Sequence, residues 1–66
     1  MRITVNDELR DVPDDLSLQE LIGSLILPAE RLAIELNRSV VRRAEWPKTK
    51  LHDNDRVEIV HFIGGG

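Results

Sequence analysis

One stretch of the sequence repeats its apolar residues at the spacing of an α-helix, and the stretches on both sides of it alternate. The apolar residues that line one face of this 3.6-residue repeat are Leu18, Leu21, Ile22, Leu25 and Ile26. Ser17 and Glu20 have the spacing of a capping box at its start, and Pro28 places its end near Ile26. A single helix with one apolar face must cover an apolar partner, so we expect the rest of the chain to form a sheet.

The segments around this helix alternate with period two, as strands with one buried face do. The predicted strands cover residues 2–6, 9–12, 32–36, 40–41 and 57–62. Turn-forming residues separate them at Asn6-Asp7-Glu8, Asn37-Arg38-Ser39 and Asp53-Asn54-Asp55. We therefore expect an α+β domain over residues 1–62, a mixed sheet with one main helix packed across one face.

The segment 44–51 follows neither period, and we expect it to be irregular. It contains Trp46, which precedes Pro47. Large aromatic side chains bury much area under a loop. We therefore interpret Trp46 as a packing anchor and not as a binding residue.

The size of the chain limits the classes of function. A domain of 66 residues buries only about 60% of the surface that its unfolded chain exposes, which disfavours a large catalytic cleft. There is no cysteine, so the chain supplies no disulfide, thiolate metal site or nucleophilic thiol. We expect a carrier, ligand or adaptor and not an enzyme.

The net charge and the lengths of the apolar runs indicate which partners and which compartment to expect. The net charge of −3 disfavours nucleic acid as a partner, because such binding needs Lys and Arg to neutralise phosphates. No apolar run has the length of a signal peptide core or a membrane span. We expect a cytoplasmic protein with no membrane partner.

Two features resemble metal sites without completing one. His52 and His61 are joined by no cysteine and no third histidine. Asp53-Asn54-Asp55 lacks the glycine and the distal glutamate of a calcium loop. We expect a turn and no bound metal.

The sequence ends in Ile63-Gly64-Gly65-Gly66. Glycine lacks a Cβ, so such an end is flexible and slender enough to enter a narrow channel. It could present the carboxylate of Gly66 as a substrate. The alternative is a frayed terminus without a function.

Several stretches together resemble the ThiS family, the sulfur carriers of thiamin thiazole biosynthesis. The most specific of them is the last run, Val57-Glu58-Ile59-Val60-His61-Phe62-Ile63-Gly64-Gly65-Gly66. The others are Ile3-Thr4-Val5-Asn6-Asp7-Glu8, Ser17-Leu18-Gln19-Glu20-Leu21, Ala33-Ile34-Glu35-Leu36-Asn37 and Asp53-Asn54-Asp55. The resemblance spans the whole chain and implies a ubiquitin-like β-grasp fold.

The resemblance also implies a role for the tail. Gly66 would be the residue that becomes an acyl adenylate and then a thiocarboxylate, and Ile63, Gly64 and Gly65 would enter the active site of a partner. The implied partners are a ThiF-like adenylyltransferase that uses ATP and magnesium, a sulfur donor fed by a cysteine desulfurase, and the thiazole synthase ThiG. The carrier itself would bind no cofactor.

Docking onto these partners would need a surface on the folded body. If Val57 and Ile59 point into the core, alternation puts Glu58, Val60 and Phe62 on the outward face of the last strand. We expect this face to dock. Opposite parity would exchange the roles, and in the other interpretation Phe62 covers the edge of the core.

Three other functions remain open from the sequence. The small subunit of molybdopterin synthase uses the same terminal chemistry, but its chain is usually longer and its tail more typically reads Pro-Pro-Val-Ala before the glycines. A protein modifier would join Gly66 to a lysine. A ubiquitin-like binding module would use no tail chemistry.

Overall fold

The computed structural model describes residues 1–25 and 31–61. Its strands are β1 (Arg2–Val5), β2 (Glu8–Asp11), β3 (Leu32–Leu36), β4 (Ser39–Val41) and β5 (Arg56–His61). One α-helix, α1, spans Leu18–Ser24, and a 3₁₀ helix, η2, spans Arg43–Lys48. The described residues form the α+β domain that the sequence pattern predicts, with the β-grasp architecture of the ubiquitin type that the resemblance implies.

The five strands form one mixed sheet in the order β2-β1-β5-β3-β4. Strand β5 lies at its centre, parallel to β1 and antiparallel to β3. The two hairpins β1–β2 and β3–β4 are antiparallel and form the two sides of the sheet. The last strand is thus inserted between the first and third.

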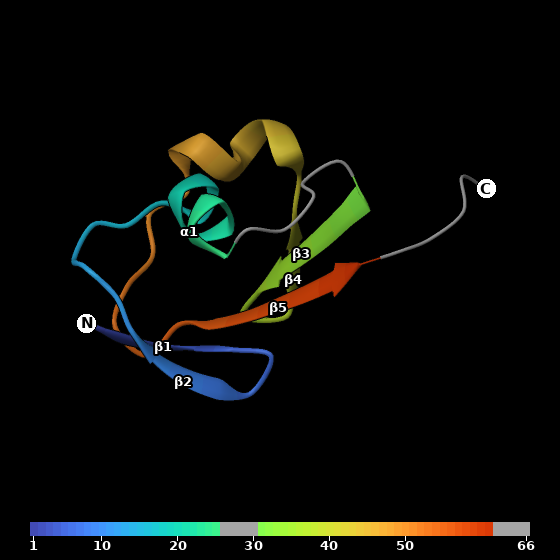
Figure 1. Cartoon of the computed structure of the whole chain (residues 1–66). Helices are drawn as coiled ribbons and strands as arrows, with labels where there is room; N and C mark the ends of the chain where they lie inside the picture. Colours follow the sequence, from blue (N-terminus) through green and yellow to red (C-terminus); the bar gives the residue numbers. More distant parts are fainter. Residues whose placement is uncertain (26–30, 62–66) are drawn as a thin grey trace.

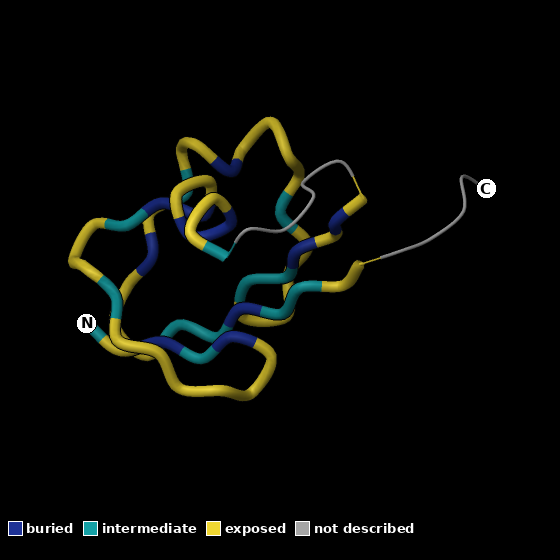
Figure 2. The backbone as a smooth tube through the Cα atoms, viewed as in Figure 1, coloured by how far each residue is buried: buried dark blue, intermediate teal, exposed yellow. Residues whose placement is uncertain are grey.

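Both helical segments lie on the same side of the sheet (Figure 1). The core between them and the sheet consists of Ile3, Val5, Leu18, Leu21, Ile22, Leu32, Ile34, Trp46, Leu51 and Val57. Figure 2 shows that buried positions alternate with exposed or intermediate ones along β1 and at the start of β3 and β5. The other face of the sheet has no helix on it among the described residues.

The start of α1 has the predicted capping box. The Ser17 hydroxyl accepts a hydrogen bond from the Glu20 backbone N–H (3.1 Å), and the Glu20 carboxylate accepts one from the Ser17 backbone N–H (3.0 Å). The bond from the Ser17 backbone N–H stabilises the ionised carboxylate and so lowers the pKa of Glu20. The helix ends at Ser24 with Leu25 as its C-cap; Ile26, where the sequence predicts the end, lies outside the described residues.

The segment around Trp46 is more regular than predicted. It forms η2, a 3₁₀ helix whose three-residue turn produces no 3.6-residue apolar repeat. Trp46 is buried, and its Nε1 donates a hydrogen bond to the Val41 carbonyl oxygen (3.0 Å). The prediction that Trp46 is a packing anchor is confirmed.

The second strand also differs slightly from the prediction. It runs over Glu8–Asp11 instead of 9–12, and all four residues are exposed. This strand lies at the edge of the sheet, beside β1 alone. Val12, just past its end, is the residue that packs partly against the core.

Both hairpins turn over two residues in the left-handed region. These residues are Asn6 (φ 49°) and Asp7 (φ 68°) in one turn, and Asn37 (φ 50°) and Arg38 (φ 73°) in the other. Two residues with positive φ match the twist of the adjoining strands, and asparagine tolerates this conformation well. Each hairpin therefore places an asparagine at the same point of its turn.

No helix within residues 1–25 and 31–61 has the length and apolar character needed to cross a bilayer.

Candidate functional site

The predicted tail residues lie beyond the last described residue. The predictions for Phe62, Ile63, Gly64, Gly65 and Gly66 all concern residues outside 1–25 and 31–61. The described site is therefore the end of β5 and the side chains around it.

The side chains of β5 alternate, and of the two parities left open by the sequence the structure has Val57 and Ile59 toward the core. Val57 is completely buried, and Ile59 packs partly against the core. Glu58 is half-buried and Val60 is 53% exposed. Because neighbouring side chains in a strand point to opposite faces, Glu58 and Val60 lie on the face of the sheet that no described helix covers. Docking by these two residues stays a prediction.

The pairing of β5 with β3, and of β3 with β4, brings three side chains of β3 and β4 to the same face. Ala33 lies opposite Val60, Glu35 lies opposite Glu58, and Val40 lies opposite Glu35. Directly opposed residues share a face, and Val40 is 72% exposed. We call Ala33, Glu35, Val40, Glu58 and Val60 the outer sheet surface.

The first three of these residues were not predicted as site residues. A sequence shows the period of each strand but not which strand lies beside which. The exposed valine at position 40, alternating with the partly buried Val41, was the one available signal.

The two carboxylates of the outer sheet surface have different surroundings. The Arg56 guanidinium holds the Glu58 carboxylate, with its Nη2 at 2.9 Å and its Nε at 3.1 Å. Within the part of the chain that the structure describes, Glu35 makes no ion pair. The surface therefore presents the Glu35 carboxylate, which has no ion pair among the described residues, between the exposed Val40 and the Arg56-bound Glu58.

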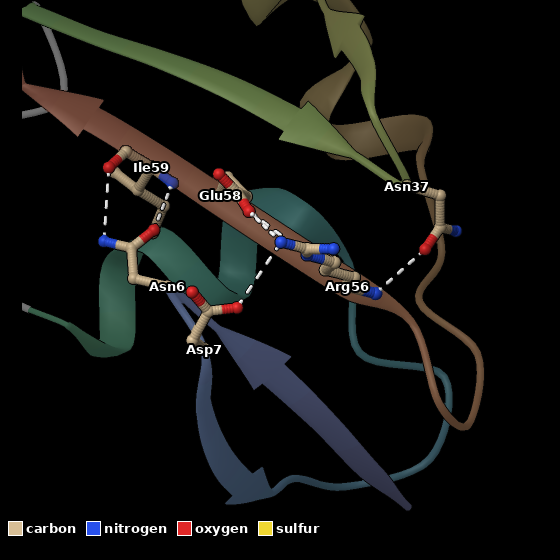
Figure 3. A network of polar contacts seen from close by, with 6 residues as sticks. All are labelled: Asn6, Asp7, Asn37, Arg56, Glu58 and Ile59. Carbon is tan, nitrogen blue, oxygen red and sulfur yellow. Dashed lines mark hydrogen bonds and ion pairs between the residues drawn. The ribbon is translucent and has the colours of Figure 1, made fainter.

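The polar contacts of β5 are concentrated on the two asparagines of the hairpin turns (Figure 3). The Asn6 side chain bonds the backbone of Ile59 twice: its Oδ1 accepts from the N–H (2.7 Å), and its Nδ2 donates to the carbonyl oxygen (3.2 Å). Asn37 bonds the other end of the strand, where its Oδ1 accepts from the Arg56 N–H (2.9 Å). An asparagine from each hairpin turn thus hydrogen-bonds the backbone of β5, one on each edge of the strand.

The two histidines lie apart in the fold. His52 lies in the turn before β5, with its Nδ1 3.9 Å from Asp55, and His61 ends β5 with an exposed side chain. Across residues 1–25 and 31–61, no three potential metal-ligating side chains gather in one place.

Comparison with known proteins identifies relatives over the whole chain. The profile of the ThiS family matches residues 2–66. The crystal structure of the thiamine biosynthesis protein ThiS from Geobacter metallireducens superposes with a TM-score of 0.89 at 36% identity, covering 100% of both chains. The sulfur carrier protein ThiS of Bacillus subtilis is 34% identical over 50 residues, 76% of each chain.

A third relative is a much longer protein. The thiazole synthase of Magnetococcus marinus is 36% identical over all 66 residues. The chain spans about a fifth of the length of the thiazole synthases that it matches.

Proposed function

The chain belongs to the ThiS family, and on that premise we propose that it is a sulfur carrier of thiamin biosynthesis that holds sulfur as a thiocarboxylate on Gly66. The observation that carries the proposal is that the family match extends through the final glycines, to residue 66. A relative named as a sulfur carrier, 34% identical, supports it.

The proposed chemistry takes place at one carbonyl carbon. A free α-carboxylate has a pKa of about 3.3–3.7 and is anionic at neutral pH, so it is a poor electrophile. A carboxylate oxygen of Gly66 attacks the α-phosphorus of ATP and pyrophosphate leaves, which gives an acyl adenylate. A sulfur nucleophile then attacks the carbonyl carbon and displaces AMP. The product is a thiocarboxylate whose sulfur is itself a nucleophile.

The catalytic groups for these steps belong to partners. We propose a ThiF-like adenylyltransferase, which uses ATP and magnesium, a sulfur donor fed by a cysteine desulfurase, and thiazole synthase as the acceptor of sulfur. Relatives named thiazole synthase support the last partner, because a segment similar to this chain makes up about a fifth of them. The need for ATP is the reason to place the reaction in the cytoplasm.

The proposal predicts a defined change in mass. After incubation with the adenylyltransferase, ATP, magnesium and sulfide, the intact protein is expected to be about 16 Da heavier, because one sulfur replaces one oxygen at the carbonyl carbon. Mass spectrometry of the intact protein measures the gain, and a reaction without ATP is the control. Lysine-linked adducts would instead indicate a protein modifier, and an unreacted chain would indicate a binding module.

We further propose that the outer sheet surface, together with Phe62, docks onto the adenylyltransferase. Exposed apolar side chains close to a reacting segment are typical of partner surfaces. The Glu35 carboxylate lies beside the exposed Val40 and makes no ion pair among the described residues. It favours a partner surface that is apolar with at least one Lys or Arg.

A charge at the centre of this surface is expected to weaken docking. Val60→Asp should raise the KM for the carrier in the adenylation reaction by about tenfold or more, because it buries an unpaired carboxylate in the interface. Steady-state adenylation kinetics measure the effect.

The matched control is Leu9→Asp. Leu9 is 68% exposed and lies on the same face of the sheet, but in β2, at the edge away from β3 and β4. It should leave the KM unchanged. Equal KM values for the two variants would exclude the outer sheet surface as the docking site.

A further inference from the structure

Strand β5 is held differently on its two sides. On one side β3 pairs with it along its length, from Leu36 opposite Val57 to Leu32 opposite His61. On the other side β1 pairs with it at two positions, Thr4 with Arg56 and Val5 with Val57. The chain of β1 then turns away into the hairpin.

The Asn6 side chain continues this second side where β1 stops. The Asn6 backbone N–H donates to the Val57 carbonyl oxygen (2.9 Å), the last backbone bond from this segment to β5. The next groups on that edge are the N–H and C=O of Ile59, and the Asn6 amide binds both (Figure 3). The Asn6 side chain thus makes the two hydrogen bonds to β5 that the backbone of one more β1 residue would make.

A second contact fastens the same turn to β5. Asp7, the residue after Asn6, has its carboxylate Oδ1 3.5 Å from the Nη2 of Arg56. The turn therefore contacts β5 at Arg56 and at Ile59, which fixes the direction in which the Asn6 amide points.

We propose that Asn6 is a positioning residue for the terminal carboxylate: by binding Ile59 on the edge that β1 leaves open, it fixes the end of β5 from which the tail departs. This inference rests on the proposed function, because it concerns delivery of Gly66 to the adenylyltransferase. Asn6 itself contacts no reacting atom. Its role is to keep the last two residues of β5 in one orientation.

The consequence is a lower entropic cost of docking. Without the Asn6 amide, the end of β5 is held by β3 alone and samples more orientations. A partner must then fix those residues when it binds, and each fixed residue costs conformational entropy. Once the tail is bound in the partner, the reacting geometry is the same, so the defect should appear in KM and not in kcat.

The chain contains a matched control for this role. Asn37 has the same left-handed backbone, with φ of 50° against 49° for Asn6, and also bonds a backbone N–H of β5. Its side chain also donates to the Asp55 carboxylate (3.0 Å). Both contacts are at the start of β5, far along the chain from the tail. A purely structural role would make the two asparagines equivalent.

The test compares Asn6→Gly with Asn37→Gly in the full chain. Glycine keeps the positive φ without strain, so each variant removes only a side chain. Asn6→Gly is expected to raise the KM for adenylation about fivefold with kcat unchanged. A change of about fivefold corresponds to the entropic cost of partly re-ordering the backbone of one or two residues on binding. It should also lower the hydrogen-exchange protection of the Ile59 amide at least tenfold. Asn37→Gly should change neither.

A conservative variant gives a second, independent readout. Asn6→Asp keeps an acceptor for the Ile59 N–H, loses the donor to its carbonyl, and tolerates positive φ. Its KM and its Ile59 protection should lie between those of the wild type and Asn6→Gly.

The outcomes separate this inference from the proposed function. If the wild-type protein is not adenylated at all, the proposed function fails and this inference fails with it. If the wild type is adenylated and both glycine variants shift KM equally, or neither shifts it, Asn6 has no positioning role and the proposed function stands.

Discussion

Removal of Gly66, or addition of one residue after it, is expected to abolish activation while the domain stays folded. Deletion moves the terminal carboxylate back by about 3.3–3.6 Å, the length of one extended residue. Misplacement of a reacting group by about 1 Å already costs on the order of a hundredfold in rate. We therefore expect adenylation to fall by at least about a hundredfold in both variants.

Thermal unfolding provides the control for this prediction. The buried core among the described residues lies between Ile3 and Val57, so both variants should unfold at the wild-type temperature. A pyrophosphate-exchange assay measures adenylation directly. Variants that are adenylated at the wild-type rate would show that Gly66 is not the activated residue.

Replacement of Trp46 by alanine is expected to unfold the domain. Trp46 is the largest of the fully buried side chains, contributes to the core between η2 and α1, and lies beneath the Arg43 guanidinium, 5.2 Å from the ring centroid. Truncating a buried Trp costs about 3–5 kcal/mol, and a core of this size rarely supplies more than about 3–5 kcal/mol in total. Far-UV circular dichroism during urea titration measures the free energy of unfolding.

The control for Trp46 is the phenylalanine variant. Trp46→Phe keeps most of the ring and loses the Nε1–H that binds the Val41 carbonyl oxygen. Leaving that acceptor without its partner should cost about 1–3 kcal/mol, so this variant should remain folded with a lower midpoint. A folded Trp46→Ala protein that loses less than about 1 kcal/mol would contradict the anchor role of Trp46.

Structural features that depend on residues only a few positions apart in the sequence could be predicted. The capping box at Ser17 and Glu20 depends on residues three apart, and the alternation of the side chains of β5 depends on a two-residue period. Both are confirmed. The helix, its apolar face and the α+β class follow from the same local patterns.

Features that depend on tertiary pairing could not be predicted. The insertion of β5 between β1 and β3 brings Ala33 and Glu35 beside Val60 and Glu58, and no local period encodes that neighbourhood. The same holds for Asn6, which the sequence identifies only as a turn residue. Its two bonds to Ile59 join residues that are 53 positions apart.

The 3₁₀ helix η2 was missed for a different reason. Its six residues contain one buried side chain, Trp46, and a proline. One apolar residue defines no period, and proline argues against an α-helix. The sequence therefore predicts the anchor and not the helical segment around it.

The central claim is that Gly66 exchanges a carboxylate oxygen for sulfur, and the mass of the C-terminal tryptic peptide tests it most directly. Trypsin cleaves after Arg56, the last Lys or Arg of the sequence, and releases residues 57–66. Oxidation of Met1 also adds about 16 Da, but it marks a different peptide. After incubation with the adenylyltransferase, ATP, magnesium and sulfide, we expect the gain of about 16 Da in the peptide 57–66 and only when ATP is present. An unchanged 57–66 peptide in a reaction that consumes ATP would contradict the account.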